Sequence, residues 1–69
     1  MKLIKDSCGG YVNADFIREI WINEEMSPER YCVKVRTGGQ AEVKVSDYYS
    51  TKEEAEVKME EFIFMLKEE

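Results

Sequence analysis

Alternating apolar and polar residues indicate that the middle of the chain forms β-strands. The run FIREIWIN, residues 16–23, is the richest in β-branched and aromatic side chains; Ile20 and Ile22 share one of its faces, and Trp21 lies on the other. Two later runs alternate in the same way, with apolar positions at Tyr31, Val33, Val35, Ala41, Val43 and Val45. We therefore expect a sheet with one apolar face.

The pairing of the last two runs follows from which side chains must meet. A two-residue turn at residues 38–39 would set Lys34 opposite Val43 and mix the two faces. A three-residue loop at 38–40, Gly-Gly-Gln, sets Val35 opposite Val43 instead. The odd-length loop is therefore predicted, with a glycine in the left-handed position of a bulge.

Three further segments are predicted as turns or connections. Residues 1–13, MKLIKDSCGGYVN, indicate a short hairpin whose glycines permit positive φ. Asn13 and Asp15 are expected to cap a local turn through their side chains. Residues 24–30, EEMSPER, are expected to form a polar connection, since Pro28 cannot donate to a central ladder.

A helix is predicted at about residues 51–68. Thr51 and Glu54 match a capping box, which starts a helix by satisfying its first amide groups. Apolar residues then recur at helical spacing and face a core: Ala55, Met59, Phe62, Ile63 and Leu66. Three more widen the apolar surface beyond this stripe: Val57, Phe64 and Met65. Tyr48 and Tyr49, just before the cap, are expected to pack where the sheet meets the helix.

Together these segments predict a single small α+β domain at residues 1–69. It contains an antiparallel sheet of four to five short strands within residues 1–47, with one C-terminal amphipathic helix packed on one face. The other face of such a sheet is exposed to water. A chain of 69 residues has a small core, so dimerisation would add to its stability.

Charge, apolar runs and cysteine content indicate the cellular location of the protein and the state of its thiols. The net charge is −5, and residues 51–69 contribute −4 of it through seven glutamates and three lysines. No apolar run is long enough for a signal peptide or a membrane span, so we expect a cytoplasmic protein without membrane contact. Cys8 and Cys32 are interpreted as free thiols, and a disulfide between them is the alternative.

The residue types argue against an enzyme. The chain has no histidine, the commonest general base and the usual partner of a serine or cysteine nucleophile. The glycine pairs at 9–10 and 38–39 do not fit a phosphate-binding loop, and no calcium loop or zinc ligand set is present. We therefore expect no catalytic residue, no cofactor and no metal.

The sheet face away from the helix is the candidate interaction surface. It is expected to carry Trp21, Cys32, Lys34, Arg36 and Lys44, together with Glu19 and Glu42. An aromatic ring among cations can stack and neutralise single-stranded nucleic acid, although the acidic chain as a whole repels phosphate. Tryptophan is also enriched in protein interfaces. The alternative for Trp21 is a place in the core, reached through a bulge.

A resemblance adds to this picture. Gly10, Tyr11, Val12 and Asn13 match a recurring Gly-aromatic-Val-Asn element, and a helix start like that at 51–55 follows it, in a broad set of very short uncharacterised proteins of Gram-positive bacteria and their prophages. The chain resembles this set over nearly its whole length. The resemblance implies two β-hairpins and a C-terminal helix, and it implies no activity and no functional residue.

Our expectation for function is a non-enzymatic protein-interaction module, or a small homo-oligomeric accessory or regulatory protein. It rests on the surplus apolar helix surface and the missing catalytic residues. The partner is then another protein or a second copy of the chain in a homodimer, while nucleic acid is disfavoured. The alternative is a weak single-stranded nucleic-acid-binding protein that uses the open sheet face.

Overall fold

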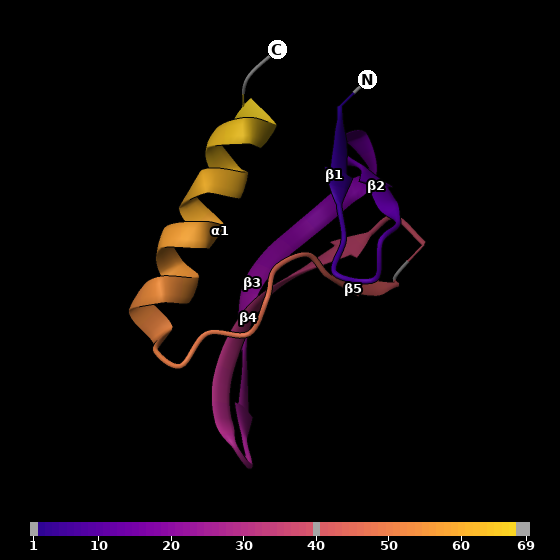
Figure 1. The fold of residues 1–69 in the computed structure, drawn as a ribbon. Coiled ribbons are helices and arrows are strands. Elements are labelled where there is room, and N and C mark those ends of the chain that lie inside the picture. The colour runs from indigo at the N-terminus through magenta and orange to yellow at the C-terminus, as the bar shows by residue number, and fades with distance from the viewer. Residues whose placement is uncertain (1, 40, 68–69) are drawn as a thin grey trace.

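The architecture is one helix packed on strands that form two small sheets (Figure 1). The computed structural model describes residues 2–39 and 41–67. Its elements are β1 (Leu3–Lys5), β2 (Tyr11–Asn13), the short 3-10 helix η1 (Ala14–Phe16), β3 (Ile17–Met26), β4 (Glu29–Thr37), β5 (Glu42–Lys44) and α1 (Lys52–Lys67). β1 pairs with β2, and the second sheet has the order β3-β4-β5, all antiparallel. The predicted α+β class is confirmed, with the described strands divided between two sheets.

The register of the three-stranded sheet places apolar side chains opposite one another. Ile20 pairs with Val35, and Val35 pairs in turn with Val43. Lys34 pairs with Lys44 rather than with Val43. The predicted register is therefore confirmed, because the competing two-residue turn would have mixed the apolar and charged faces.

The loop between β4 and β5 differs from the prediction in its backbone. The amide of Thr37 donates to the carbonyl of Ala41 at 3.2 Å, which closes the loop. Neither Gly38 nor Gly39 has a positive φ, so the expected left-handed glycine is not at either position. Gln40, the third residue of the predicted loop, lies outside the described residues.

The segment at residues 24–30 is not a polar connection, and this prediction was wrong. Strand β3 continues to Met26, β4 begins at Glu29, and a two-residue turn with a cis Ser27-Pro28 peptide bond joins them. Pro28 fits because the turn needs no amide donor to a ladder. The end of this long hairpin extends beyond the rest of the molecule (Figure 1).

The N-terminal hairpin forms as predicted and is closed by an aspartate. Ile4 pairs with Val12, and both side chains are buried. The Asp6 carboxylate accepts from the amide of Cys8 at 2.9 Å and from that of Gly10 at 2.8 Å, while Gly9 takes the left-handed conformation at φ 90°. The next turn is also confirmed, because the Asn13 side chain accepts from the amide of Asp15 at 2.9 Å.

The core lies between α1 and the three-stranded sheet. Phe62, at 6% exposure, packs with Val33, Val35 and Val45, and Ile4 of the first hairpin joins the same cluster. Partly buried side chains of the helix pack against this cluster: Met59, Met65 and Leu66. The apolar sheet face therefore supports the helix, as the alternation predicted.

Helix α1 begins where the capping box places it. The Thr51 hydroxyl accepts from the amide of Glu54 at 3.3 Å and donates to the Glu54 carboxylate at 3.1 Å. In the described part of the chain, no helix is long and apolar enough to cross a membrane.

Candidate functional site

The structure gathers all four predicted surface residues on the sheet face away from the helix. Trp21 pairs with Lys34 across the β3–β4 ladder, and Lys34 pairs with Lys44 across the β4–β5 ladder. Arg36 places its guanidinium carbon 5.1 Å from the centroid of the Trp21 ring. Trp21 is half-buried on this face, so the alternative that it lies in the core is wrong.

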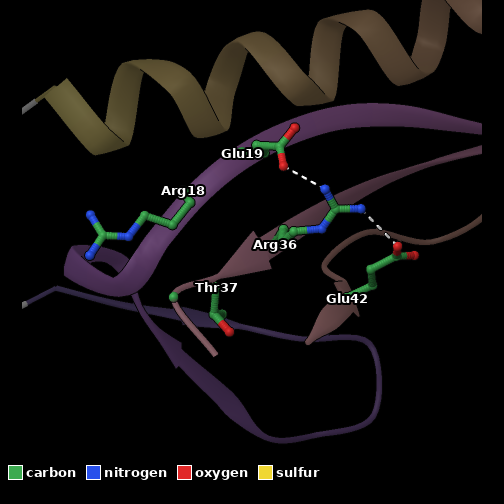
Figure 2. A pocket seen from close by; sticks show the side chains of 6 residues that line it. Arg18, Glu19, Arg36, Thr37 and Glu42 are labelled. Atoms are coloured by element: carbon green, nitrogen blue, oxygen red, sulfur yellow. Dashed lines mark hydrogen bonds and ion pairs between the residues drawn. The ribbon is translucent and has the colours of Figure 1, made fainter. Parts of the chain in front are cut away.

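Arg36 is held between two glutamates on this face. It donates to Glu19 at 2.5 Å and to Glu42 at 3.0 Å, and these hydrogen bonds, above all the one to Glu42, raise the pKa of Arg36. Arg36 and both glutamates line an open hollow of about 640 Å³. Arg18 lines the same hollow and points away from Arg36 (Figure 2). Because two arginines and two glutamates line the hollow, it has no surplus of positive charge for an anion.

Tyr48 also lies on this outer face, where we did not predict it. The Arg30 guanidinium carbon is 3.7 Å and the Lys44 ammonium is 3.8 Å from the centroid of its ring. Its hydroxyl donates to Glu25 at 3.1 Å. The prediction that Tyr48 packs between sheet and helix was wrong, because the cations of β4 and β5 attract the ring to the opposite face.

Glu25 links this cluster to the β3–β4 hairpin. Two N–H groups of Arg30 donate to one Glu25 oxygen, at 2.8 and 3.0 Å. This hydrogen bonding to Arg30, with a second contribution from Tyr48, lowers the pKa of Glu25. The pair bridges opposite positions of the ladder and so helps to explain why residues 24–30 continue the strands.

The two cysteines are free thiols, as predicted, and they lie in different surroundings. Cys8 is exposed at the end of the first hairpin, whereas Cys32 is fully buried on β4. Burial raises the pKa of the Cys32 thiol. Cys32 therefore lacks the depressed pKa and the access that a reactive thiol needs.

The outer sheet face therefore satisfies most of its own charges. Trp21 and Tyr48 are both contacted by cations of the same chain. Its four cations, on Arg30, Lys34, Arg36 and Lys44, stand beside three glutamates, Glu19, Glu25 and Glu42. A ligand that used these rings or charges would first have to displace these internal contacts.

A second surface lies on the far side of α1 from the sheet. Val57 and Phe64 are 58% and 65% exposed. They are seven residues apart, which places them within about 20° of each other around the helix. We call Val57, Phe64 and the four glutamates next to Val57 the outward stripe; the glutamates are Glu53, Glu54, Glu60 and Glu61.

The outward stripe is flanked by two shallow hollows. One, of about 490 Å³, is lined by Val57, Phe64 and Met65 together with Glu60 and Glu61. The other, of about 400 Å³, adjoins it at Val57 and Glu61 and extends to Tyr49. Hollows with apolar floors and carboxylate edges are chemically suited to binding, and Lys58 also lines the second of them. Among residues 2–39 and 41–67, no three cysteine or acidic side chains gather into a metal-ligand set.

The sequence predicted surplus apolar residues on the helix, but we placed the candidate interaction surface on the sheet. The surplus apolar positions Val57 and Phe64 are exposed, whereas the third, Met65, packs partly against the core. Tyr11 and Val12 of the Gly-aromatic-Val-Asn element form the start of β2, where Val12 is buried and Tyr11 is exposed. Comparison with models of known protein families, with curated proteins and with solved structures found no match to this chain.

Proposed function

We propose that this chain is a non-enzymatic protein-interaction module that binds its partner through the outward stripe of α1. The observation that carries the proposal is the exposure of Val57 and Phe64, 58% and 65%, on the helix face opposite the core. Covering two such side chains would contribute roughly 1.5–3 kcal/mol each. A contact of this size is enough to anchor a small interface.

Other apolar residues of the same helix are buried, which sets Val57 and Phe64 apart. Ala55 and Phe62 are buried against the sheet, so the core already has the apolar side chains that it needs from α1. Val57 and Phe64 add nothing to that packing. Apolar residues that the fold does not use, placed in line on a rigid helix, are typical of a helical docking surface.

The outer sheet face supports the proposal less well. Trp21, Lys34, Arg36 and Lys44 do lie together, but Arg36 forms ion pairs with Glu19 and Glu42, and Lys44 contacts Tyr48. Burying these groups under a partner would require that partner to replace the contacts they already make. We therefore assign the primary contact to the helix.

The second candidate function is weak binding of single-stranded nucleic acid by the outer face. One observation favours it: within the described residues, Lys34 has no ion-pair partner at salt-bridge distance, and the face carries one more cation than anion. Titration with an oligonucleotide at low salt tests it through the NMR signals of Trp21 and Lys34. Shifts that disappear as salt is raised would support this candidate.

We further propose a cytoplasmic location and a relation to small bacterial and prophage proteins. The free thiols of Cys8 and Cys32 are consistent with a reducing compartment, and we place the protein in the cytoplasm. The relation to small prophage and bacterial proteins is part of the same proposal and rests on the resemblance of residues 10–13 and 51–55.

Affinity capture followed by reconstitution tests the proposed function. The wild-type chain, a Val57→Ala/Phe64→Ala variant and a Met26→Ala variant are immobilised, and each captured protein is purified and titrated by calorimetry. Met26 is the matched control because it is 66% exposed at the end of the β3–β4 hairpin. We expect the stripe variant to bind a true partner at least about tenfold more weakly, and Met26→Ala to bind like wild type. A partner that binds the stripe variant as tightly as wild type would refute the proposed site.

A further inference from the structure

We infer that the partner of the outward stripe is a cationic amphipathic segment, with an apolar side chain at its centre and Lys or Arg on both sides. This inference rests on the proposed function and adds the chemical class of the partner. Its basis is the charge that surrounds the apolar residues of α1.

The residues one helical turn before and after Val57 are all acidic, and Lys58 lines the second hollow beside it. Positions three and four residues away in each direction are neighbours on a helix, and for Val57 they are Glu53, Glu54, Glu60 and Glu61. All four are exposed. An apolar contact at Val57 therefore lies inside a ring of carboxylates.

The same acidic flank continues toward Phe64. Glu60 and Glu61 precede Phe64 by four and three residues, and both line the hollow that contains Val57 and Phe64. Glu60 forms no ion pair among the described residues, and Glu61 meets Lys58 at 3.4 Å on the exposed surface. An exposed pair of this kind is weak, so the carboxylate is available to a stronger cation.

A second copy of this chain fits the stripe poorly. Two α1 helices packed through Val57 and Phe64 would bring the glutamates of both copies together at the rim of the contact. Like charges opposite each other in an interface cost free energy and select against that pairing. A segment with cations at the rim removes the repulsion and adds charge-assisted contacts.

The dimensions of the surface suit one short helix. Helix α1 has 16 residues, which corresponds to about 24 Å. The two hollows at Val57 lie side by side, so an apolar side chain of the partner can enter each of them. The partner chemistry is thus a helix of similar length with apolar residues along one face and basic residues beside them.

The test uses a synthetic 16-residue peptide, the length of α1, with leucine along one helical face and lysine elsewhere. A second peptide replaces every lysine by glutamate, and a third keeps the lysines but replaces every leucine by glutamine. Binding to the full chain is followed by calorimetry and by NMR shifts. We expect measurable binding of the first peptide alone, centred on the signals of Val57 and Phe64.

Matched variants separate the apolar from the electrostatic part. Glu60→Gln/Glu61→Gln is compared with Glu24→Gln/Glu29→Gln, which removes the same charge at the β3–β4 hairpin. We expect the first pair to weaken the lysine–leucine peptide about fivefold at low salt and the control pair to change it less than twofold. Val57→Ala/Phe64→Ala should weaken the same peptide at least about tenfold.

Each outcome decides between the inference and the proposed function. Equal loss of affinity in both glutamate pairs would mean that net charge alone attracts the peptide, and the inference would fail while the stripe could still bind another partner. Capture of a natural partner whose binding depends on Val57 and Phe64 but not on Glu60 and Glu61 would again refute the cationic partner and leave the outward stripe as the binding site. Light scattering that shows a dimer abolished by Val57→Ala/Phe64→Ala would replace the cationic partner by a second copy.

Discussion

Cys8 and Cys32 differ in solvent exposure, which limits the access of a reagent to each thiol. Cys8 is exposed in a turn, whereas Cys32 has 0% exposure and a pKa raised by burial. Alkylating reagents react with an accessible thiolate, so we expect one thiol of the folded chain to react quickly and the other to be protected. Mass spectrometry after a short iodoacetamide pulse should find the label on Cys8 in buffer and on both residues in urea. Rapid labelling of a folded Cys8→Ser variant would contradict the burial of Cys32.

Glu25 makes stability depend on pH in one direction. Its hydrogen bonds to Arg30 and Tyr48 lower its pKa in the folded chain below the ordinary value of 4.5. A lowered folded pKa means that its stabilisation is present above the unfolded pKa and is lost as pH falls through the folded pKa. We expect Glu25→Gln to lower Tm most near pH 7, at low salt, and to differ less from wild type below about pH 4.

The control for this pH dependence is Glu29→Gln, since Glu29 is exposed and forms no salt bridge among the described residues. Its Tm difference from wild type should stay small across the same pH range. A Glu25→Gln variant whose Tm difference is independent of pH would show that Glu25 is not preferentially ionised in the fold.

Single residues in turns were the hardest to predict. Asp6 holds the first hairpin through two backbone amides, and Tyr48 lies across Arg30 and Lys44, yet no periodic pattern indicated either role. Periodicity decides the direction of a side chain inside a strand or helix, and it does not apply to an irregular segment such as residues 46–50. An aspartate side chain often accepts a hydrogen bond from the backbone amide two residues later in a turn. This signal could have identified Asp6.

At the level of elements, the start of α1 depends on one hydroxyl. Thr51 both accepts from the Glu54 amide and donates to the Glu54 carboxylate. Replacing it by alanine leaves that amide without its side-chain acceptor, and we expect the free energy of unfolding to fall by about 1 kcal/mol. Urea unfolding followed by circular dichroism measures this change. Thr51→Ser keeps the hydroxyl and should lose less than half as much; equal losses would show that the cap is not the cause.

The elements that sequence predicted well share a strict period. Alternation placed Ile20, Val35 and Val43 on one face and fixed the β4–β5 register, because a shift of one residue would expose them all. Residues 24–30 lack that pattern and contain Pro28, so they were interpreted as a connection. The backbone ladder continues there to Met26 and Glu29, and the cross-strand contact of Glu25 with Arg30 supports it; this contact is visible only once the register is known.

At the scale of the whole molecule, the candidate site depends on which helix face the sheet covers. The sequence predicted more apolar positions on α1 than one stripe requires, but it could not say which would remain exposed. The answer depends on the orientation of the helix over Val33 and Val35, which also decides that Met65 packs and Phe64 does not. The surplus of apolar residues on α1 was therefore predictable. Only the structure shows that Val57 is exposed, and so that the glutamates around it surround an accessible apolar side chain.

Two phenylalanines of α1 test the whole arrangement directly. Phe62 is 6% exposed and belongs to the core cluster, while Phe64, two residues later, is 65% exposed. Phe62→Ala removes buried contacts and is expected to cost about 3–5 kcal/mol, which is comparable to the total stability of roughly 3–10 kcal/mol for a chain of this size. Phe64→Ala should change the free energy of unfolding by less than about 0.5 kcal/mol, because alanine is also the better helix former. Urea titration of both variants gives the comparison. If the two losses were equal, or if Phe64→Ala were the more damaging, the helix would be rotated relative to the sheet, and the outward stripe would not exist as a binding surface.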